Sequence, residues 1–529
     1  MILFIMCLII YFLYDFSKVK TALQMLQQNF YNESNRYLKW TLRNIDKAYI
    51  TFDLLALILI FIPLFIKDTN ICYTIFLIVY GIIYIIDRIN KKTEQVKKPL
   101  VVTFRIKRLA FTVALFYVLV LILYFTILNK STFALFTILV LMNVLAYIKV
   151  YLSYLINLPI EQLTYNYYKN KAATKISSFN TISIGVTGSY GKTSSKNILY
   201  DILSKKYIVY ASPGNFNTPL GLMRTINQYL DKFDEIFIPE ISASRVHDIK
   251  RSCDFIKPKY GIITNIGLAH LDTFKTEENI QKTKFELIES LPNDGLGVLN
   301  IDDPKQRSYK LKNNCRIKWI GIDSQEGDCY AFNIKYTNKG TSFDCKFKDD
   351  GKIINFKTKL FGKPNIYNIL AGLMIAKDLG LTYEQMQNGV ASIKPIEHRL
   401  ELKKYKNVTI IDDAYNSNPV GSKMALDVLS LMPGMKIVVT PGMIELKDKE
   451  YELNKKFGEY ISECADYVIL VGKKQTKPIQ DGLSENNYQK EKIFIINDVK
   501  EAFPLIDKLK DNDTYVLLEN DLPDLFNEK

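Results

Sequence analysis

The chain has 529 residues, of which 48% are hydrophobic and 23% are charged, and its formal net charge is +14. At roughly 150 residues per domain, this length predicts three or four structural units. Residues 1–150 hold 17 Lys and Arg against 7 Asp and Glu, which is +10 of the total charge. The rest of the chain therefore lacks the basic character of a nucleic-acid-binding protein, and no nucleic acid is expected as a partner.

The seven cysteines are scattered along the chain and form no Cys-x-x-Cys pair. This spacing argues against a zinc ribbon and against a disulfide scaffold. It fits a protein whose cysteines lie in the reducing cytoplasm.

Five apolar runs occupy the N-terminal region, at about 1–16, 50–66, 72–87, 109–128 and 132–150. The last two runs reach the roughly 20 residues that a membrane-spanning helix needs. The connections at 17–49 and 88–108 carry six and eight basic residues, whereas the short loops near 67–71 and 129–131 carry one each. Because basic loops stay on the cytoplasmic side, we predict about five transmembrane helices over 1–150, with the remaining chain in the cytoplasm.

Buried core helices are the alternative for these runs, and their length and charge asymmetry disfavour it. The runs contain almost no ionisable residues, whereas a transport path usually carries charges inside the membrane. We therefore expect an anchor, or a platform in contact with lipid, in the inner membrane of the cell.

The pattern of the chain changes after residue 150. Residues 151–180 are mixed and polar, and we expect a linker there. From 181 onward, short β-branched runs alternate with helical patterns, which predicts an α/β fold with a parallel sheet. Segment 325–360 alternates in the manner of strands joined by turns, so it is predicted to be a β-rich insertion. A second α/β pattern begins near 397, which gives two predicted domains, 181–396 and 397–529.

The segment GVTGSYGKTS at 185–194 lies between a β-branched run and a helical pattern. A glycine loop between a strand and a helix is typical of a phosphate-binding loop. The consensus G-x-x-x-x-G-K-[ST] is met except at its first glycine, where Val186 stands. The two glycines let backbone N–H groups face anionic oxygens, the lysine reaches the terminal phosphates, and the threonine ligates Mg²⁺. The expected ATP-binding residues are Gly188, Ser189, Gly191, Lys192, Thr193 and Ser194. A glycine-rich turn with an incidental lysine is the alternative.

Four further motifs follow this loop in order. They are TNIGLAHLDTFKTEENIQKTKFELIES at 264–290, GKPNIYNILAG at 362–372, EHRLE at 397–401 and DDAYNSNP at 412–419. Together with the loop, they resemble the Mur ligase family, and the resemblance covers about 180–520. The segments GNFNTPLGL and DDAYNSNPVGSKMAL are most similar to the family member that adds D-alanyl-D-alanine.

The resemblance implies an ATP- and Mg²⁺-dependent ligase of cell-wall precursor synthesis. Such an enzyme activates a precursor carboxylate as an acyl phosphate, which the amine of an amino acid or dipeptide then attacks. It also implies a fold in which a central ATP-binding α/β domain precedes a Rossmann-like C-terminal α/β domain, here behind an α-helical membrane region. Positioning and charge neutralisation dominate such chemistry, so cations are expected around the terminal phosphate.

By the same resemblance, three residues are implied to be catalytic, namely Lys192, Lys284 and His270. The implied metal ligands are Thr193, Glu240, His270 and Lys284, with Lys284 carried as a carbamate. For Glu240, His270 and Lys284 the alternatives are an ordinary strand-end carboxylate, a locally satisfied histidine and a helix-surface lysine.

The remaining implied residues contact the nucleotide or the substrate. Asn365 and Asn368 resemble the asparagines that contact adenine, Arg399 the arginine at the domain hinge, and Asp413 the carboxylate that reaches the ribose. Pro364 stands where many relatives have histidine, and a turn-capping role is the alternative for Asp413. The implied substrate-binding residues are Asn215, Asn217, Thr218, Tyr415, Asn416 and Asn418, with plain polar loops as the alternative.

The chain also departs from the family pattern. Membrane-like sequence stands where relatives carry the domain that holds the UDP end of the precursor, and YVLLENDLPDLF at 515–526 replaces the expected Lys-Gly-Ser type of ending. A second enzyme hypothesis therefore keeps the chemistry with a lipid-linked or poly-amino-acid acceptor. A transport ATPase is disfavoured, because it leaves the last two motifs unexplained. A non-catalytic scaffold is disfavoured, because the phosphate-site residues are retained.

Overall fold

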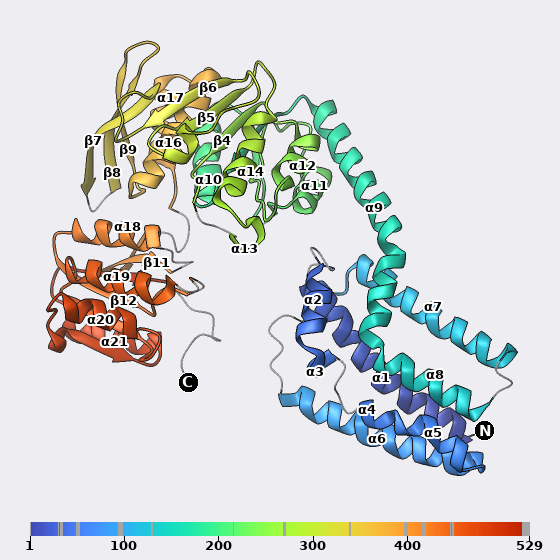
Figure 1. Ribbon diagram of the computed structural model, residues 1–529. Helices are drawn as coiled ribbons and strands as arrows, with labels where there is room; N and C mark the ends of the chain where they lie inside the picture. The colour runs from blue at the N-terminus through green and yellow to red at the C-terminus, as the bar shows by residue number, and fades with distance from the viewer. Residues whose placement is uncertain are drawn as a thin grey trace. The chain divides into compact units, whose positions relative to one another are not determined.

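The computed structural model describes residues 2–29, 31, 35–48, 53–93, 99–127, 131–214, 216–267, 271–337, 340–395, 400–414, 419–444, 446 and 449–520. The chain forms two compact units, Met1–Tyr167 and Tyr168–Lys529, whose elements are labelled in Figure 1.

The first unit consists of helices. They are α1 (Ile2–Gln28), α2 (Arg36–Arg43), α3 (Ile45–Ala48), α4 (Asp53–Ala56), α5 (Ile58–Phe65), α6 (Thr69–Thr93), α7 (Phe104–Thr126), α8 (Thr132–Val144) and the start of α9 (Ala146–Phe179). Many large apolar side chains on these helices face outward, among them Phe111 at 66% and Leu119 at 62% exposure. An outward apolar surface of this extent suits contact with lipid.

Three of the helices in the described ranges are long and apolar enough to cross a membrane: α1, α6 and α7. Helices α8 and α9 pass the same test only as a pair, and they bend by 76° at their break, while Leu54–Phe65 is a shorter apolar helix. The predicted runs 1–16 and 72–87 therefore extend well beyond their expected lengths. The count of about five spans stays a prediction, because two of the five runs do not form long straight helices.

Residues 151–180, which we expected to form a linker, are helical. Helix α9 has 34 residues and continues to Phe179 with Pro159 inside it. At a rise of about 1.5 Å per residue, such a helix is about 50 Å long. The polar composition therefore reflects a helix with an exposed polar surface and not an irregular connection. The domain bounds based on sequence stay a prediction.

A buried ion pair lies among the apolar helices of the first unit. Lys149 Nζ is 3.0 Å from Asp15 Oδ1, and both side chains are 4% exposed. Asn143 Nδ2 donates to Asp15 Oδ1 at 3.3 Å, and the Tyr117 hydroxyl bonds both Asp15 and Lys149. No local pattern predicts this network, because Asp15 and Tyr117 lie on helices that are distant in sequence from each other and from the pair Asn143 and Lys149.

We expect the single variants Asp15→Ala and Lys149→Met to destabilise the first unit by about 3–5 kcal/mol, since each leaves an uncompensated buried charge. The double variant Asp15→Leu/Lys149→Met removes both charges and is expected to recover most of that loss. Thermal unfolding of the full chain in detergent measures the effect. Single variants as stable as the parent would show that the pair does not hold these helices together.

The second unit contains two sheets and their covering helices. In the first sheet the strands are β1 (Ile182–Thr187), β2 (Val209–Ala211), β3 (Ile236–Ile238), β4 (Tyr260–Ile263), β5 (Leu296–Asn300), β6 (Arg316–Gly321), β7 (Cys329–Thr337), β8 (Gly340–Phe347) and β9 (Ile353–Thr358). Their order is β2-β3-β1-β4-β5-β6-β7-β8-β9. The helices of this part are α10 (Lys192–Leu203), α11 (Pro219–Gln228), α12 (Asp248–Ile256), α13 (Leu271–Phe274), α14 (Glu277–Glu289), α15 (Pro304–Arg307), α16 (Lys363–Asp378) and α17 (Tyr383–Ser392).

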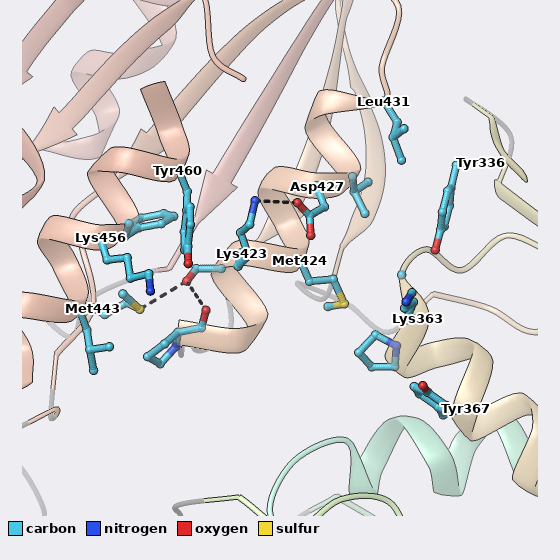
Figure 2. Close-up of a pocket in the computed structure, with 17 residues that line it drawn as sticks. Tyr336, Lys363, Tyr367, Lys423, Met424, Asp427, Leu431, Met443, Lys456 and Tyr460 are labelled. Carbon is cyan, nitrogen blue, oxygen red and sulfur yellow. Dashed lines mark hydrogen bonds and ion pairs between the residues drawn. The ribbon is translucent and has the colours of Figure 1, made fainter. Parts of the chain in front are cut away.

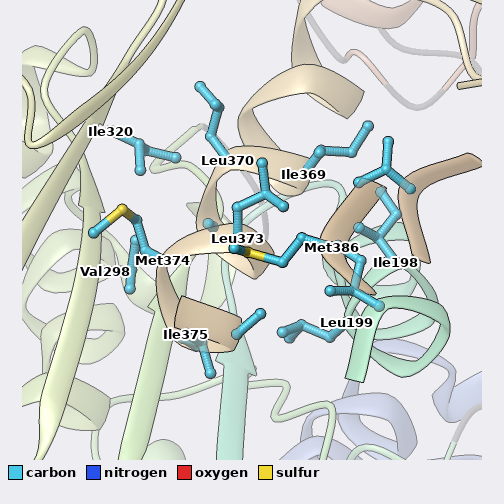
Figure 3. Packing of buried hydrophobic residues seen from close by; sticks show 14 of the residues in the cluster. Ile198, Leu199, Val298, Ile320, Ile369, Leu370, Leu373, Met374, Ile375 and Met386 are labelled. Atoms are coloured by element: carbon cyan, nitrogen blue, oxygen red, sulfur yellow. The ribbon is translucent and has the colours of Figure 1, made fainter. Parts of the chain in front are cut away.

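Strands β1 to β7 pair in parallel, whereas β7, β8 and β9 pair antiparallel. The last three form the β-rich insertion predicted at 325–360, which extends the parallel sheet at one edge. The core lies between the strands and helices α10, α16 and α17. Figure 3 shows Leu373 and Met374 of α16 between Ile198 of α10 and Val298 of β5. This packing fixes α10, and with it the loop that precedes it.

The second sheet has the order β10-β11-β15-β12-β13-β14. Its strands are β10 (Glu401–Tyr405), β11 (Val408–Asp413), β12 (Met435–Thr440), β13 (Tyr467–Val471), β14 (Ile493–Ile496) and β15 (Thr514–Glu519). Helices α18 (Pro419–Ser430), α19 (Glu450–Ser462), α20 (Lys477–Glu485) and α21 (Ala502–Leu509) accompany them, with short 3₁₀ turns at Lys490–Lys492 and Val499–Glu501. Only β10 pairs antiparallel. Two largely parallel α/β sheets confirm the predicted fold class.

Candidate active site

The phosphate-binding loop connects β1 to α10, and its two glycines are required by the backbone. Gly188 has φ 153° and Gly191 has φ 76°, a region that favours glycine. A Cβ on Gly188 would lie 1.9 Å from Thr264 Oγ1. Position 186, which departs from the consensus, is a fully buried valine of β1, so the loop begins after it.

Hydrogen bonds hold the loop against the segment that follows β4. Ser189 Oγ donates to Gly267 O at 2.8 Å and accepts from Gly267 N at 2.9 Å, and Tyr190 N donates to Asn265 Oδ1 at 2.9 Å. Lys192 Nζ folds back onto the loop and donates to Gly188 O at 2.9 Å and to Ser189 O at 3.1 Å. The loop is therefore shaped before any phosphate arrives, with its lysine already over it.

Glu240 brings three predicted motifs together. It is 3% exposed and lies beside the end of β1 through a parallel bridge to Val186. Thr193 Oγ1 donates to Glu240 Oε2 at 2.9 Å, and Asn217 Nδ2 donates to Glu240 Oε1 at 3.1 Å. The phosphate loop and the loop that holds Asn217, which we call the substrate loop after its predicted role, thus meet at this carboxylate.

The structure adds Lys196 to this group. Its Nζ lies 3.5 Å from Glu240 Oε2 and donates to Ser212 O at 2.8 Å. Burial lowers the pKa of Lys196, and Glu240 opposes that shift. The sequence analysis missed Lys196, although its spacing of three residues from Thr193, which places both on one face of α10, was a usable signal.

Thr193 and Glu240 fit Mg²⁺. Both offer oxygen, the donor that Mg²⁺ prefers, and Mg²⁺ commonly takes one or two protein ligands and fills its octahedron with phosphate oxygens and water. Within the described ranges, no group of three His, Cys, Asp or Glu side chains gathers as a cage. A metal here would therefore be shared with a nucleotide.

Lys284 is 3% exposed on α14, which rules out a helix-surface lysine. Burial lowers its pKa to about 7, and the nearby charge of Lys192 adds to the shift, while Glu286 and Asp248 oppose it. The amine is therefore neutral in much of the protein near neutral pH. A neutral amine can react with carbon dioxide, as the implied carbamate demands.

The lowered pKa of Lys284 predicts a pH-dependent stability cost. Below a pH of about 7 the lysine is protonated in both the folded and the unfolded chain, so the cost of the buried charge is complete. Between about 7 and 10.5 only the unfolded chain binds the proton, so stability rises with pH. In CO₂-free buffer, Lys284→Met should raise the thermal midpoint most at a pH of about 6 and least at about 9.5. A constant difference across this range would contradict the assigned shift.

Asn365 and Asn368 lie beside the phosphate loop, on the first turns of α16. Asn368 is 5% exposed, and its Nδ2 lies 3.6 Å from the position of a Cβ on Gly191. Asn365 Nδ2 donates to Phe361 O at 2.8 Å, and its side chain lines a small cavity with Ser194. The structure therefore places both asparagines next to α10, and their contacts with the nucleotide stay predictions.

Asp413 ends β11, and its Oδ1 accepts from Leu400 N at 3.1 Å. Its neighbour Asp412 accepts from Lys403 Nζ at 2.7 Å and from Ala414 N at 3.2 Å. Thr218 Oγ1 accepts from Gly221 N at 3.3 Å and thereby caps α11. Thr218 thus has a local capping role, whereas Asp413 bonds the backbone 13 residues earlier, and the roles of both toward nucleotide and substrate stay predictions.

Six predicted residues lie outside the described ranges. They are Asn215, His270, Arg399, Tyr415, Asn416 and Asn418.

A cavity of about 670 Å³ lies elsewhere in the second unit. Figure 2 shows Lys363 and Tyr367 of α16 on one side of it, and Lys423 of α18 and Lys456 and Tyr460 of α19 on the other. Lys423 pairs there with Asp427 at 3.0 Å. Among the predicted site residues that the structure describes, none lines this cavity. The candidate site is therefore identified by the phosphate loop and Glu240, because there the predicted phosphate-binding lysine and two oxygen donors for a metal lie together.

Comparisons with known proteins agree with this geometry. The sequence model described as Mur ligase middle domain matches residues 186–376, and the one described as Mur ligase, glutamate ligase domain matches 398–518. The chain is 31% identical over 307 residues to the UDP-N-acetylmuramoyl-tripeptide--D-alanyl-D-alanine ligase of Bacillus subtilis, covering 57% of this chain and 65% of that protein. It is 28% identical to the ligase of the same name from Escherichia coli, covering 55% and 64%. The matched region thus spans slightly less than two thirds of these relatives.

Among solved structures, the MurF ligase from Thermotoga maritima in complex with ADP aligns with a TM-score of 0.59 and 29% identity, over 67% of this chain and 80% of that one. A MurF from Acinetobacter baumannii, at 23% identity and a TM-score of 0.61, supports the fold alone. The two family models together cover more than half of the chain. The first match contains the phosphate loop and Glu240, and the second match lies over the second sheet. The chain belongs to the Mur ligase family.

Proposed function

We propose that this protein is an ATP-dependent ligase that forms an amide bond on a cell-wall precursor through an acyl phosphate. By likeness to the named relatives, the leading substrates are a UDP-muramoyl-tripeptide and D-alanyl-D-alanine. The observation that carries the proposal is the meeting of Thr193 of the phosphate loop, Asn217 of the substrate loop and Lys196 at the buried Glu240. A carboxylate substrate held by that loop would lie near the terminal phosphate.

The residues of the chain act mainly by positioning and by charge. Lys192 would leave the loop carbonyls for the phosphate oxygens, and Asn365 and Asn368 would orient the adenine. Thr193 and Glu240 would hold Mg²⁺, which supplies charge neutralisation on the phosphates when it is bound. Lys284 as a carbamate, together with His270, would ligate a second Mg²⁺. Arg399 and Asp413 would hold the nucleotide, and Asn215, Thr218, Tyr415, Asn416 and Asn418 would contact the substrates.

We further propose that the first unit anchors the enzyme in the cell membrane, with the catalytic unit in the cytoplasm. Helices α1, α6 and α7 support the anchor by length and composition, and the basic connections support the orientation. The same helices favour the second candidate function, in which the acceptor is a lipid-linked precursor or a poly-amino-acid chain.

Phosphate release by the purified full chain in detergent tests the proposal. With ATP and Mg²⁺, release should require both UDP-muramoyl-tripeptide and D-alanyl-D-alanine, and mass spectrometry should find the joined product. Activity only with a lipid-linked acceptor would favour the second candidate. No stimulation by any pair of carboxylate and amine would contradict ligase activity.

A further inference from the structure

Lys196 forms a buried ion pair with the carboxylate that is proposed to bind metal. Its Nζ lies 3.5 Å from Glu240 Oε2, and both side chains are 4% exposed. The same carboxylate oxygen accepts the Thr193 hydroxyl at 2.9 Å. A cation of the protein therefore lies beside the oxygen atoms that a metal would need.

Ser212 holds both members of this pair. Its carbonyl accepts from Lys196 Nζ at 2.8 Å, and its hydroxyl accepts from Glu240 N at 3.0 Å. Ser212 itself is 2% exposed. The ammonium is therefore fixed in place, and its position next to Glu240 is part of the folded site.

The charges of this arrangement oppose a metal that arrives alone. A buried carboxylate without a counter-charge is costly, and Lys196 removes that cost. A divalent cation that binds at Thr193 and Glu240 must then approach the fixed positive charge of Lys196. A bound nucleotide brings several negative charges to the same loop, and these charges attract the metal more than Lys196 repels it.

We propose that Lys196 is a resident counter-ion of Glu240 that makes metal binding at Thr193 and Glu240 conditional on bound nucleotide. This inference rests on the proposed function for the identity of the metal site. It assigns Lys196 as a positioning residue, which sets the order of binding and not the chemistry. In an enzyme of this design, the Lys196 ammonium balances the charge of Glu240 while no metal is bound.

Binding of Mn²⁺, followed by electron paramagnetic resonance on the full chain in detergent, tests the proposal. Without nucleotide, Lys196→Met should bind Mn²⁺ at least about tenfold more tightly than the parent. Lys196→Arg keeps the charge and should bind as the parent does. Glu240→Gln should lose the site with and without ADP, which identifies the signal that belongs to it. Lys205→Met, the same change at an exposed lysine after α10, should have no effect.

The parent protein provides a second measurement that does not depend on how Lys196→Met folds. The site to follow is the one whose Mn²⁺ signal is lost in Glu240→Gln. In the parent protein, this site should fill at a far lower Mn²⁺ concentration when ADP is present than when it is absent. Equal Mn²⁺ affinity with and without ADP would overturn the proposal, as would a folded Lys196→Met that binds Mn²⁺ alone no better than the parent. Neither readout uses an acceptor or an amine. Failure of the proposed ligase reaction can therefore be distinguished from failure of this metal-binding proposal.

Discussion

Replacement of Lys192 by alanine is expected to reduce ATP-dependent ligation by about 10²–10³-fold, the cost of removing one group that stabilises charge in a transition state. The side chain lies over the phosphate loop and donates to Gly188 O and to Ser189 O. Lys192 itself is half-buried and lies outside the hydrophobic core of this part of the chain. The free energy of unfolding should therefore change by no more than about 0.5 kcal/mol.

Phosphate release with saturating substrates, together with thermal unfolding of the full chain, measures both effects. Lys205→Ala serves as the matched control, because that lysine is exposed just beyond α10 and should keep full activity. Retained turnover in Lys192→Ala would mean that the phosphates bind at another place. A large loss of stability would mean that Lys192 is a structural residue of the loop.

Replacement of Lys284 by alanine is expected to reduce ligation by about 10²-fold or more, because a misplaced reacting group costs about that much. The carbamate hypothesis gives the chemical reason for this loss of ligation. The neutral amine attacks the carbon of CO₂, an N–C bond forms, one C=O bond becomes a carboxylate, and the proton from nitrogen goes to solvent. The product is an anion that can ligate a metal, in place of a cation that repels it.

Three measurements test this role. Protein equilibrated with ¹³C-bicarbonate should show a carbamate signal by nuclear magnetic resonance that is absent from Lys284→Ala. Acetate or formate should partly restore the activity of Lys284→Ala, since either can supply the missing carboxylate in the space left by the side chain. Lys282→Ala, two residues earlier on α14, should behave as the parent. Full activity of Lys284→Ala without added carboxylate would contradict the role.

The sequence predicted those parts of the site that depend on local pattern. The phosphate loop was predicted because a strand, a glycine turn and a helix adjoin in sequence, and the positive φ angles of Gly188 and Gly191 agree with it. Segment 325–360 was predicted as strands because its polar and apolar residues alternate, and β7, β8 and β9 bear this out. Glu240 was placed beside Thr193 by the family resemblance, and the hydrogen bond between the two side chains agrees with that placement.

The linker at 151–180 stays a prediction, and the sequence left its helical conformation open, because polar composition does not distinguish an irregular connection from a helix with an exposed polar surface. The lengths of the apolar helices predicted at 1–16 and 72–87 were underestimated for a related reason. Residues such as Asp15 and Lys18 interrupt an apolar pattern in sequence, whereas in the structure both side chains are buried within α1.

The sequence by itself determined the family, the nucleotide loop and the apolar N-terminal region, because each depends on residues that are close in sequence or on composition. Only the tertiary structure decided that Lys196 pairs with Glu240, that Lys284 is buried and that Asp15 meets Lys149 across 134 residues. The physical reason is that the cost of a buried charge depends on which opposite charge faces it. That partner is brought near by the packing of distant elements, and no local pattern records it.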